Sequence, residues 1–405
     1  MNPLFKWYRK RPYPEKTSSD GLAVKVIHSF YRSSQPSGVN ETVLQQADLL
    51  ARHGYDVELI YLASDDLERS RLATAATGAG MLVGSPLAEI PHSWCEGADI
   101  LHIHNTFPSM SLRSLANLRV PKVISLHNYR AFCANGLFLR NGQRCMDCTR
   151  HGSWHSVIHG CYRRSRLRTI PVASQQVGSK SLASFLSKCD AVVVPGEPMR
   201  DILAQLGVHN LEVLPNPIRP QPPSTDIELT DPAWLFAARL TAEKGLAEVL
   251  EIWPRNVVLL VVGEGATQSA CEEIIERRGL RVELLGALPN QHLRALMSQC
   301  IGFIFASKAQ EGAPMVYGEA LNAGLPVLAA RGSTVAAQVE LDRTGMTFDL
   351  DNEYALTDAM ATVSSHRDEL AQRARKIFAA RYSPEQWAEG VGIVYQKAIR
   401  AQFNE

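Results

Sequence analysis

The chain alternates short, continuously apolar runs with longer stretches of helical character, in two successive series. Strands that are apolar throughout are typical of parallel sheets buried on both faces, because helices then cover both sides. The first series comprises Ala23–His28, Val57–Leu62, Ile100–His104, Lys122–His127 and Ala191–Val194. The second comprises Trp234–Ala238, Val257–Val262, Val282–Leu285, Ile301–Ala306 and Pro326–Ala329. The pattern predicts an α/β chain with two Rossmann-like, doubly wound parallel sheets.

A Pro-rich stretch without periodicity, Leu214–Asp231, separates the two series and indicates an interdomain linker. At 405 residues the chain is long enough for two domains. We expect an N-terminal domain over residues 1–215, a linker over 216–230, a C-terminal domain over 231–385 and a closing helix over 386–405.

Composition narrows the class of protein. Lys and Arg total 42 against 41 Asp and Glu, so the charge predicts no nucleic-acid partner. No apolar run approaches the roughly 20 residues of a membrane span, and the basic start MNPLFKWYRKRPYPEK lacks the apolar segment of a secretory signal. We therefore expect a cytoplasmic protein whose eight cysteines are reduced thiols or metal ligands rather than disulfides.

Two strand ends in the second series carry residues suited to a phosphorylated ligand. The segment ARLTAEKG places Arg239 and Lys244 after a strand, at the edge where open α/β sheets bind ligands. Two cations there suit a diphosphate, although both could equally be ordinary surface cations. The segment VVGEG ends a strand with Gly263 and Gly265, where a ligand can approach the backbone closely or the chain simply turns.

A third strand end, within Ser307–Pro326, leads through a Gly-containing turn into a helix expected from about Pro314 to Asn322. The N–H groups at a helix start suit a phosphate. Glu311 in the turn and Glu319 in the helix offer carboxylates to sugar hydroxyls, and the alternative is two solvated glutamates.

The order of these motifs resembles glycosyltransferase family 4. The resemblance rests on ARLTAEKG, VVGEG, LLGALPNQHLRALMSQC, the two glutamates and AGLPVLAARGS, and in the first half on QPSGVNETVLQQADLLARHGYDVELI and ADILHIHN. It covers nearly the whole chain. It implies the GT-B fold, in which two Rossmann-like domains face each other across a cleft and the closing helix packs back on the first.

The resemblance also implies an activity. A retaining enzyme of the hexosyltransferase type would move a sugar from a nucleoside-diphosphate sugar to a saccharide or lipid-linked acceptor, in polysaccharide or glycolipid biosynthesis. No metal cofactor is expected for catalysis, because cations and helix N–H groups can neutralise the leaving diphosphate. The alternative is a non-catalytic subunit of the same fold that binds a sugar nucleotide or a glycan.

Residue roles follow from the same resemblance. Arg239 and Lys244 would hold the diphosphate, Glu311 the transferred sugar and Glu319 the ribose, while His127 would reach toward the donor sugar. The donor-binding set is completed by Gly38, Gly263, Gly265, Ala313, Pro314 and Met315. Two departures, Ser37–Gly38 for the usual glycine pair and Asn128 where Asp is frequent, bear on loop geometry.

Histidines at the strand ends of the first half allow a simpler interpretation. Apart from the resemblance, His127 is more typical of a core histidine at a strand end than of a catalytic group. His102 and His104 alternate along one strand, and we expect them to be core residues facing opposite sides.

An irregular segment of about residues 130–182 interrupts the alternation, and we interpret it as an insertion in the first domain. Its Cys133, Cys145, Cys148 and Cys161 surround a C-x-x-C and suit a tetrahedral structural zinc; the alternative is packed, reduced thiols. Its arginines, with Lys6, Arg9, Lys10 and Arg11, suggest contact with an anionic membrane surface or lipid-linked acceptor at the inner face of the membrane, against the alternative of a solvated basic surface.

Overall fold

The computed structural model describes residues 7–11, 21–30, 38–63, 90–106, 110, 115–174, 185–220, 229 and 231–403. The chain divides into two compact units. The first unit combines residues 1–138, 146–217 and 387–405, and the second combines residues 139–145 and 218–386. The last helix, α17 (Pro384–Phe403), therefore belongs almost wholly to the first unit.

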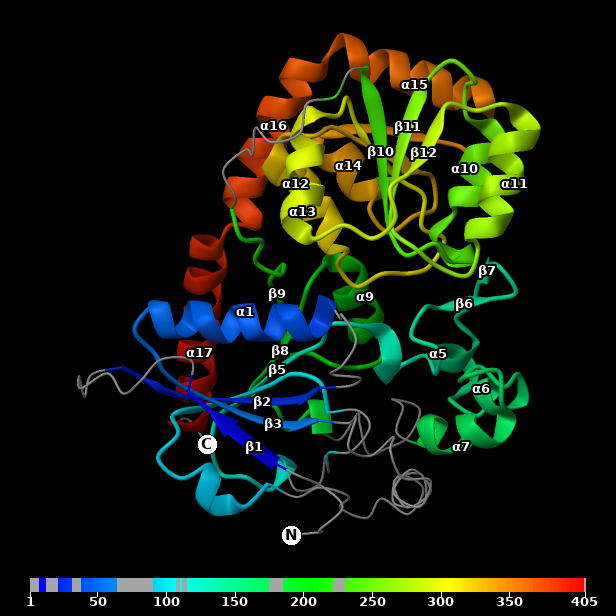
Figure 1. Cartoon of the computed structure of the whole chain (residues 1–405). Helices are drawn as coiled ribbons and strands as arrows, with labels where there is room; N and C mark the ends of the chain where they lie inside the picture. Colours follow the sequence, from blue (N-terminus) through cyan, green and yellow to red (C-terminus); the bar gives the residue numbers. More distant parts are fainter. Residues whose placement is uncertain are drawn as a thin grey trace. The chain divides into compact units, whose positions relative to one another are not determined.

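The first unit contains a seven-stranded sheet in the order β1-β3-β2-β4-β5-β8-β9 (Figure 1). Its strands are β1 (Trp7–Lys10), β2 (Ala23–Phe30), β3 (Asp56–Ala63), β4 (Ile100–Ile103), β5 (Lys122–Ser125), β8 (Ala191–Val194) and β9 (Leu211–Val213). All pair in parallel except β1, which lies antiparallel on β3. The five runs expected from the sequence are confirmed as strands. The edge strands β1 and β9 are additional, because a basic or three-residue edge strand lacks the long apolar run of a central one.

Helices cover both faces of this sheet. The helices of this unit within the described residues are α1 (Gly38–Arg52), η1 (His92–Trp94), η2 (Tyr129–Ala131), α5 (Asp147–His151), α6 (His155–Ile158), α7 (Arg166–Ser174), α9 (Glu197–Gln205) and α17. On one face, α1 and α17 pack on Val24 and Val26 of β2. On the other, α9 packs in the cluster that contains Ile27. Side chains of both faces of β2 are thus buried, which explains its apolar sequence.

The second unit contains a six-stranded, fully parallel sheet in the order β12-β11-β10-β13-β14-β15. Its strands are β10 (Ala233–Ala237), β11 (Val258–Val262), β12 (Val282–Leu284), β13 (Phe303–Phe305), β14 (Val327–Ala330) and β15 (Gly345–Phe348). The five expected strands are confirmed, and β15 is additional. The carboxyl ends of parallel strands lie at one edge of a sheet, and the loops that follow them gather there.

The helices of the second unit also lie on both faces of its sheet (Figure 1). They are η3 (Ala242–Lys244), α10 (Leu246–Ile252), α11 (Gln268–Arg278), α12 (Asn290–Gln299), α13 (Met315–Ala323), α14 (Ala336–Asp342), α15 (Glu353–Ser365) and α16 (Arg367–Arg381). One core joins α10, α11 and α15 to the sheet, and the other joins α12, α13, α14 and α16. The expected α/β class with two parallel sheets is confirmed.

The irregular segment is more ordered than its sequence indicates. A hairpin of β6 (Leu139–Arg140) and β7 (Gln143–Arg144) turns through Asn141 and Gly142, both at positive φ. Asn-Gly is the residue pair that a two-residue hairpin turn favours. The short helices α5, α6 and α7 follow. None of the helices in the described part of the chain is long and apolar enough to cross a membrane.

Candidate active site

Lys244 and Glu311 meet at the carboxyl edge of the second sheet. Lys244 ends η3, directly after β10, and Glu311 lies in the turn that follows β13. The Lys244 Nζ atom lies 2.9 Å from Glu311 Oε1, and about one fifth of each side chain is exposed. The sequence placed both residues at strand ends, and the structure brings them into direct contact.

Hydrogen bonds between loops hold this ion pair in place. The backbone N–H of Glu311 donates to Thr334 Oγ1 at 2.9 Å, and Thr334 follows β14. The backbone N–H of Lys308 donates to the carbonyl of Glu243 at 2.8 Å, which joins the β13 loop to the β10 loop. Three successive strand ends therefore form one fixed group. Thr334 has no charge or motif that marks it in the sequence, and only the adjacency of β13 and β14 shows its role.

Arg239 lies at the same edge, but its side chain is exposed to solvent. It follows β10 and is exposed, and its carbonyl accepts a hydrogen bond from Thr241 N–H at 2.9 Å. Its guanidinium has no hydrogen bond or ion pair with the described residues. A solvated guanidinium keeps all five N–H donors for a ligand. Arg239 is therefore the side chain of this edge best suited to gain a partner from outside the protein.

Glu319 is paired within the second unit. It lies in α13, is 9% exposed, and its Oε1 accepts a hydrogen bond from Arg294 of α12 at 3.0 Å. Arg294 also donates to the carbonyl of Arg219 at 3.5 Å. Glu311 and Glu319 thus face different cations, although eight residues separate them. Arg294 carries no signal in the sequence, because it reaches Glu319 only through the packing of α12 on α13.

The glycines at the end of β11 have a structural cause. A Cβ on Gly263 would lie 1.9 Å from the carbonyl oxygen of Ala238, and one on Gly265 would lie 2.2 Å from that of Leu240. Gly263 also has φ +129°, which side chains disfavour. The β10 and β11 loops therefore pack backbone against backbone. This packing alone requires both glycines, whatever ligand lies near them.

The start of α13 has the form that the sequence predicts. The helix runs from Met315 to Ala323, with Pro314 as its N-cap and Gly324, at φ +71°, as its C-cap. Pro314 brings no side-chain acceptor to the helix start, and Ala313, Pro314 and Met315 are all half-buried. The N-terminal end of a helix carries a partial positive charge. This end therefore suits an anion.

In the first unit, His127 belongs to a cluster of imidazoles at the strand ends. Its Nε2 lies 2.9 Å from Nδ1 of His104, and the two rings are stacked with centroids 5.2 Å apart. It also forms a hydrogen bond with the side chain of Asn216. Both partners lie in the first unit. His127 is thus half-buried and oriented by its own unit.

His102 and His104 are both buried, as expected of core residues, but they share one side of the sheet. Their ring centroids lie only 4.1 Å apart. The expectation that they face opposite sides is wrong, because residues two apart on a strand point to the same face. His102 contacts Tyr395 Oη of α17 at 2.7 Å and Ser125 Oγ at 2.8 Å.

The histidine cluster is electrically neutral near pH 7. Burial lowers the pKa of His102 and of His127 to about 3, and that of His28 to about 4. Burial likewise lowers the pKa of His104 well below its usual value. His127 can therefore exchange hydrogen bonds with a ligand, but it brings no positive charge.

Gly38 is the first residue of α1 and is exposed, and a Cβ placed on it would meet no atom within 4 Å among the described residues. The same helix start carries Asn40, whose Oδ1 lies 3.0 Å from His28 Nε2. The α1 start is therefore joined to the histidine cluster. Ser37 and Lys6 lie outside the described residues.

The four cysteines proposed as zinc ligands differ in how deeply they are buried. Cys133 is buried and donates to Asn135 Oδ1 at 3.0 Å, whereas Cys145, Cys148 and Cys161 are half-buried. All eight cysteines lie within the described residues, and none forms a disulfide. The one group of three potential metal-ligating side chains found in the described part of the chain contains no cysteine.

Two family models match the chain. The model described as Glycosyltransferase Family 4 matches residues 36–221, and that described as Glycosyl transferases group 1 matches residues 218–381. The putative colanic acid biosynthesis glycosyltransferase WcaL of Escherichia coli K12 is 27% identical over 191 residues. That match covers 43% of this chain and 45% of WcaL, so it spans less than half of either protein.

Solved structures of similar fold cover nearly the whole chain. Anabaena HepE in complex with UDP and glucose has a TM-score of 0.60 and 16% identity, and covers 93% of this chain and 99% of its own. Sucrose-phosphate synthase from Thermosynechococcus elongatus has a TM-score of 0.63 and 15% identity, with 94% and 100% covered. At these identities the likeness shows the fold, and it agrees with two Rossmann-like domains.

Proposed function

Because the chain belongs to glycosyltransferase family 4, we propose that it transfers a hexose from a nucleoside-diphosphate sugar to a saccharide or lipid-linked acceptor, with retention of configuration. The observation that carries this proposal is the group of charges at the carboxyl edge of the second sheet. There an exposed Arg239 and the Lys244–Glu311 pair lie on loops that are hydrogen-bonded to one another. Such an edge is where open α/β sheets bind phosphorylated ligands.

The proposed reaction breaks the bond between the anomeric carbon and the diphosphate oxygen. The acceptor oxygen bonds to that carbon on the same face, and its proton passes to the departing diphosphate. Negative charge grows on the diphosphate as the bond breaks, so fixed cations stabilise the transition state more than the bound donor. We assign this role to Arg239 and Lys244, with the half-buried start of α13 at Ala313, Pro314 and Met315 as a further anion-binding element.

Glu311 has two tasks in this proposal. It holds Lys244 at 2.9 Å before the donor arrives, which fixes the ammonium near its working position. Its carboxylate then accepts hydrogen bonds from the hydroxyls of the transferred sugar. A ligand that brings its own negative charge to Lys244 also releases Glu311 for the sugar, so binding of diphosphate and of sugar would be coupled.

Glu319 is assigned to the ribose. Its Oε1 is occupied by Arg294, which orients the carboxylate from within the protein. A carboxylate has two oxygens and about four acceptor sites, so one charged partner leaves capacity for a ribose hydroxyl. Arg294 is then a positioning residue for the donor site.

His127 is assigned to the donor sugar, as a neutral hydrogen-bonding group. It makes its hydrogen bonds with His104 and Asn216, so contact with a sugar would replace or extend one of them. The imidazole pair and the neighbouring start of α1 at Gly38 are the part of the first unit that we assign to substrate binding.

The donor and pathway are proposed from the relatives. The printed name of WcaL places that protein in colanic acid biosynthesis, and HepE is bound to UDP and glucose. We propose that this chain likewise uses a nucleoside-diphosphate hexose, with uridine as the first nucleoside to test, to build a polysaccharide or glycolipid. The second candidate function is a non-catalytic subunit that binds the same donor.

A thermal-shift screen followed by a transfer assay tests this function. UDP-, GDP- and dTDP-hexoses are compared at equal concentration, because a donor that binds the folded state raises Tm by mass action. The best donor, radiolabelled, is then incubated with a membrane extract. Label in a glycan or lipid fraction supports the enzyme; a Tm rise without transfer supports the binding subunit; neither response contradicts both.

We also propose that the protein works at the cytoplasmic face of a membrane, through the segment of α6 and α7. Trp154, Ile158 and Leu167 are 58%, 56% and 80% exposed there. The same segment exposes Arg163, Arg164, Arg166 and Arg168. Apolar side chains beside arginines suit an anionic bilayer surface.

The basic residues near the N-terminus contribute less to this surface than their sequence suggests. Arg9 is paired with Glu58 at 2.5 Å, and Arg11 with Asp56 at 3.0 Å. Flotation with anionic and with neutral vesicles tests the membrane proposal. Recovery with anionic vesicles only, reduced by Leu167→Ser, supports it, and equal recovery with both contradicts it.

A further inference from the structure

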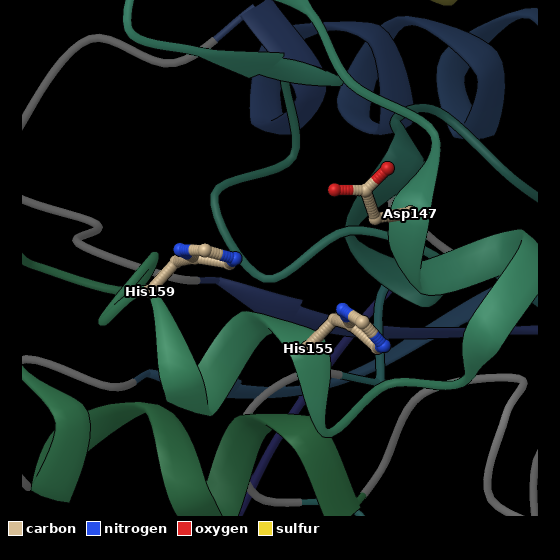
Figure 2. Close-up of side chains that lie close together, drawn as sticks. All are labelled: Asp147, His155 and His159. Carbon is tan, nitrogen blue, oxygen red and sulfur yellow. The ribbon is translucent and has the colours of Figure 1, made fainter.

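The segment that carries the cysteines also contains a group of three side chains that could ligate a metal. Asp147 lies in α5, His155 begins α6, and His159 is the C-cap of α6 (Figure 2). One ligand atom from each lies within 4.8 Å of the other two. Asp147 and His155 are half-buried, and His159 is exposed. We propose that these three residues form a binding site for a divalent transition metal, with zinc as the preferred ion.

The distances are close to those that zinc requires. A tetrahedral zinc with bonds of about 2.0–2.2 Å holds its ligand atoms about 3.4 Å apart. The three atoms must therefore approach by at most about 1.4 Å, which side-chain rotation supplies. His155 and His159 are one helical turn apart, so their rings lie on one face of the helix.

Local hydrogen bonds fix the backbone from which the ligands project. Gly152, at φ +98°, ends α5 and allows the turn into α6. The buried Ser156 of α6 donates from Oγ to the carbonyl of Ser153 in that turn at 2.6 Å. The N–H of His159 donates to the carbonyl of His155 at 3.3 Å. These bonds fix the backbone of α6, from which His155 and His159 project.

The donor set selects the class of metal. Two neutral imidazoles and one carboxylate suit zinc or a neighbouring transition metal, whereas calcium and magnesium prefer oxygen ligands alone. His151 is a candidate fourth ligand, because its ring centroid lies 5.4 Å from that of His155. Otherwise a water completes the tetrahedron. The site joins α5 to α6. Large apolar side chains of this segment, such as Trp154 and Ile158, are exposed rather than packed in a core. A bound metal would therefore stabilise the segment where hydrophobic packing does not.

Zinc titration of the chelator-stripped full chain, against a competing chromophoric chelator, tests the site. We expect one zinc per chain, and a loss of affinity of at least about 100-fold in His155→Ala/His159→Ala, because even a change outside the ligand shell costs 10–100-fold. His92→Ala/His209→Ala, which removes two exposed histidines elsewhere in the first unit, is the matched control and should bind as the unmodified chain does. Asp147→Asn gives a second variant that removes a charge with little change of shape.

Cobalt spectroscopy separates this site from the four-cysteine site suggested by the sequence. Cobalt held by nitrogen and oxygen gives no sulfur-to-metal charge-transfer band, whereas cobalt held by thiolates does. We expect no such band, and unchanged zinc affinity in Cys145→Ser/Cys148→Ser. A charge-transfer band, loss of zinc in the cysteine variant, full zinc affinity in the His155/His159 variant, or no zinc binding by the unmodified chain would each overturn the proposal.

Discussion

The two sheets carry different chemistry at the same edge. In the first unit, the strand ends hold buried or half-buried imidazoles that form hydrogen bonds with one another and remain neutral, as His104 and His127 do. In the second unit, the strand ends hold charged side chains that are half-buried in ion pairs or exposed to solvent, as Lys244 and Arg239 are. The strand ends of the first sheet therefore supply neutral hydrogen-bonding groups, whereas those of the second sheet supply charged groups.

The charged edge should respond most strongly to the loss of one cation. Arg239→Ala should lower kcat by about 100-fold or more, because it removes a partner of the charge that grows in the transition state. Since the guanidinium has no partner in the described protein, Tm should not change. Steady-state kinetics and a thermal melt measure both. Arg255→Ala, an exposed arginine just before β11, is the control, and equal rates in the two variants would remove Arg239 from the site.

Loss of the buried Arg294–Glu319 pair of the second unit should lower both the stability of the protein and its affinity for the donor. Arg294→Ala leaves the Glu319 carboxylate without its cation at a site only 9% exposed. We expect the free energy of unfolding to fall by about 2–3 kcal/mol, and donor affinity to fall with it. Denaturant unfolding and a donor titration measure the two effects. Adding Glu319→Gln should restore part of the stability but not the affinity, and a purely additive double variant would argue against the pairing.

The stability of the first sheet, whose strand ends hold neutral histidines, should fall in acid. Because the folded-state pKa of His102, about 3, lies below the ordinary value of 6.5, the unfolded chain takes up the proton first. Stability is thus complete above about pH 6.5 and is lost as the pH falls toward 3, by about 2 kcal/mol at pH 5 for one histidine. Hydrogen exchange of the β4 amides at pH 7 and pH 5 measures this loss. His102→Gln should show a smaller loss by about that amount, and an identical pH dependence would contradict the assignment.

The smallest expected effect concerns the orientation of His127. His104→Phe keeps a buried ring but removes the hydrogen bond between His104 Nδ1 and His127 Nε2. One hydrogen bond is worth about 1 kcal/mol, so kcat should fall by roughly 5-fold to 10-fold with KM nearly unchanged. His209→Phe, at an exposed position before β9, is the control. A change in KM alone would assign His104 to substrate binding instead.

The sequence predicts the sheets and the charged edge because both depend on local order along the chain. An apolar run followed by a charged or Gly-containing turn identifies a strand end, and this is how Arg239, Lys244 and Glu311 were found. Their partners depend on contacts between distant segments. Arg294 reaches Glu319 only because α12 packs on α13, and Thr334 reaches Glu311 only because β14 lies beside β13.

Metal ligands are harder still to predict, because a metal site depends on the distances between ligand atoms, which the sequence does not give. Cysteine spacing predicts one zinc site, and the potential metal-ligating atoms that the structure places within 4.8 Å of one another belong to Asp147, His155 and His159. The side on which His102 and His104 lie was predictable, since it follows from the two-residue period of a strand.

The position of α17 has a consequence for synthesis of the chain. Trp387, Val391 and Tyr395 are buried in the same core as β2 and α1, although more than 300 residues separate them in sequence. A ribosome therefore releases the whole second unit before the helix that completes the core of the first. Until α17 has been synthesised, the nascent first unit exposes the apolar side chains of β2 and α1 that α17 covers, and this is the interval when a chaperone would be needed most.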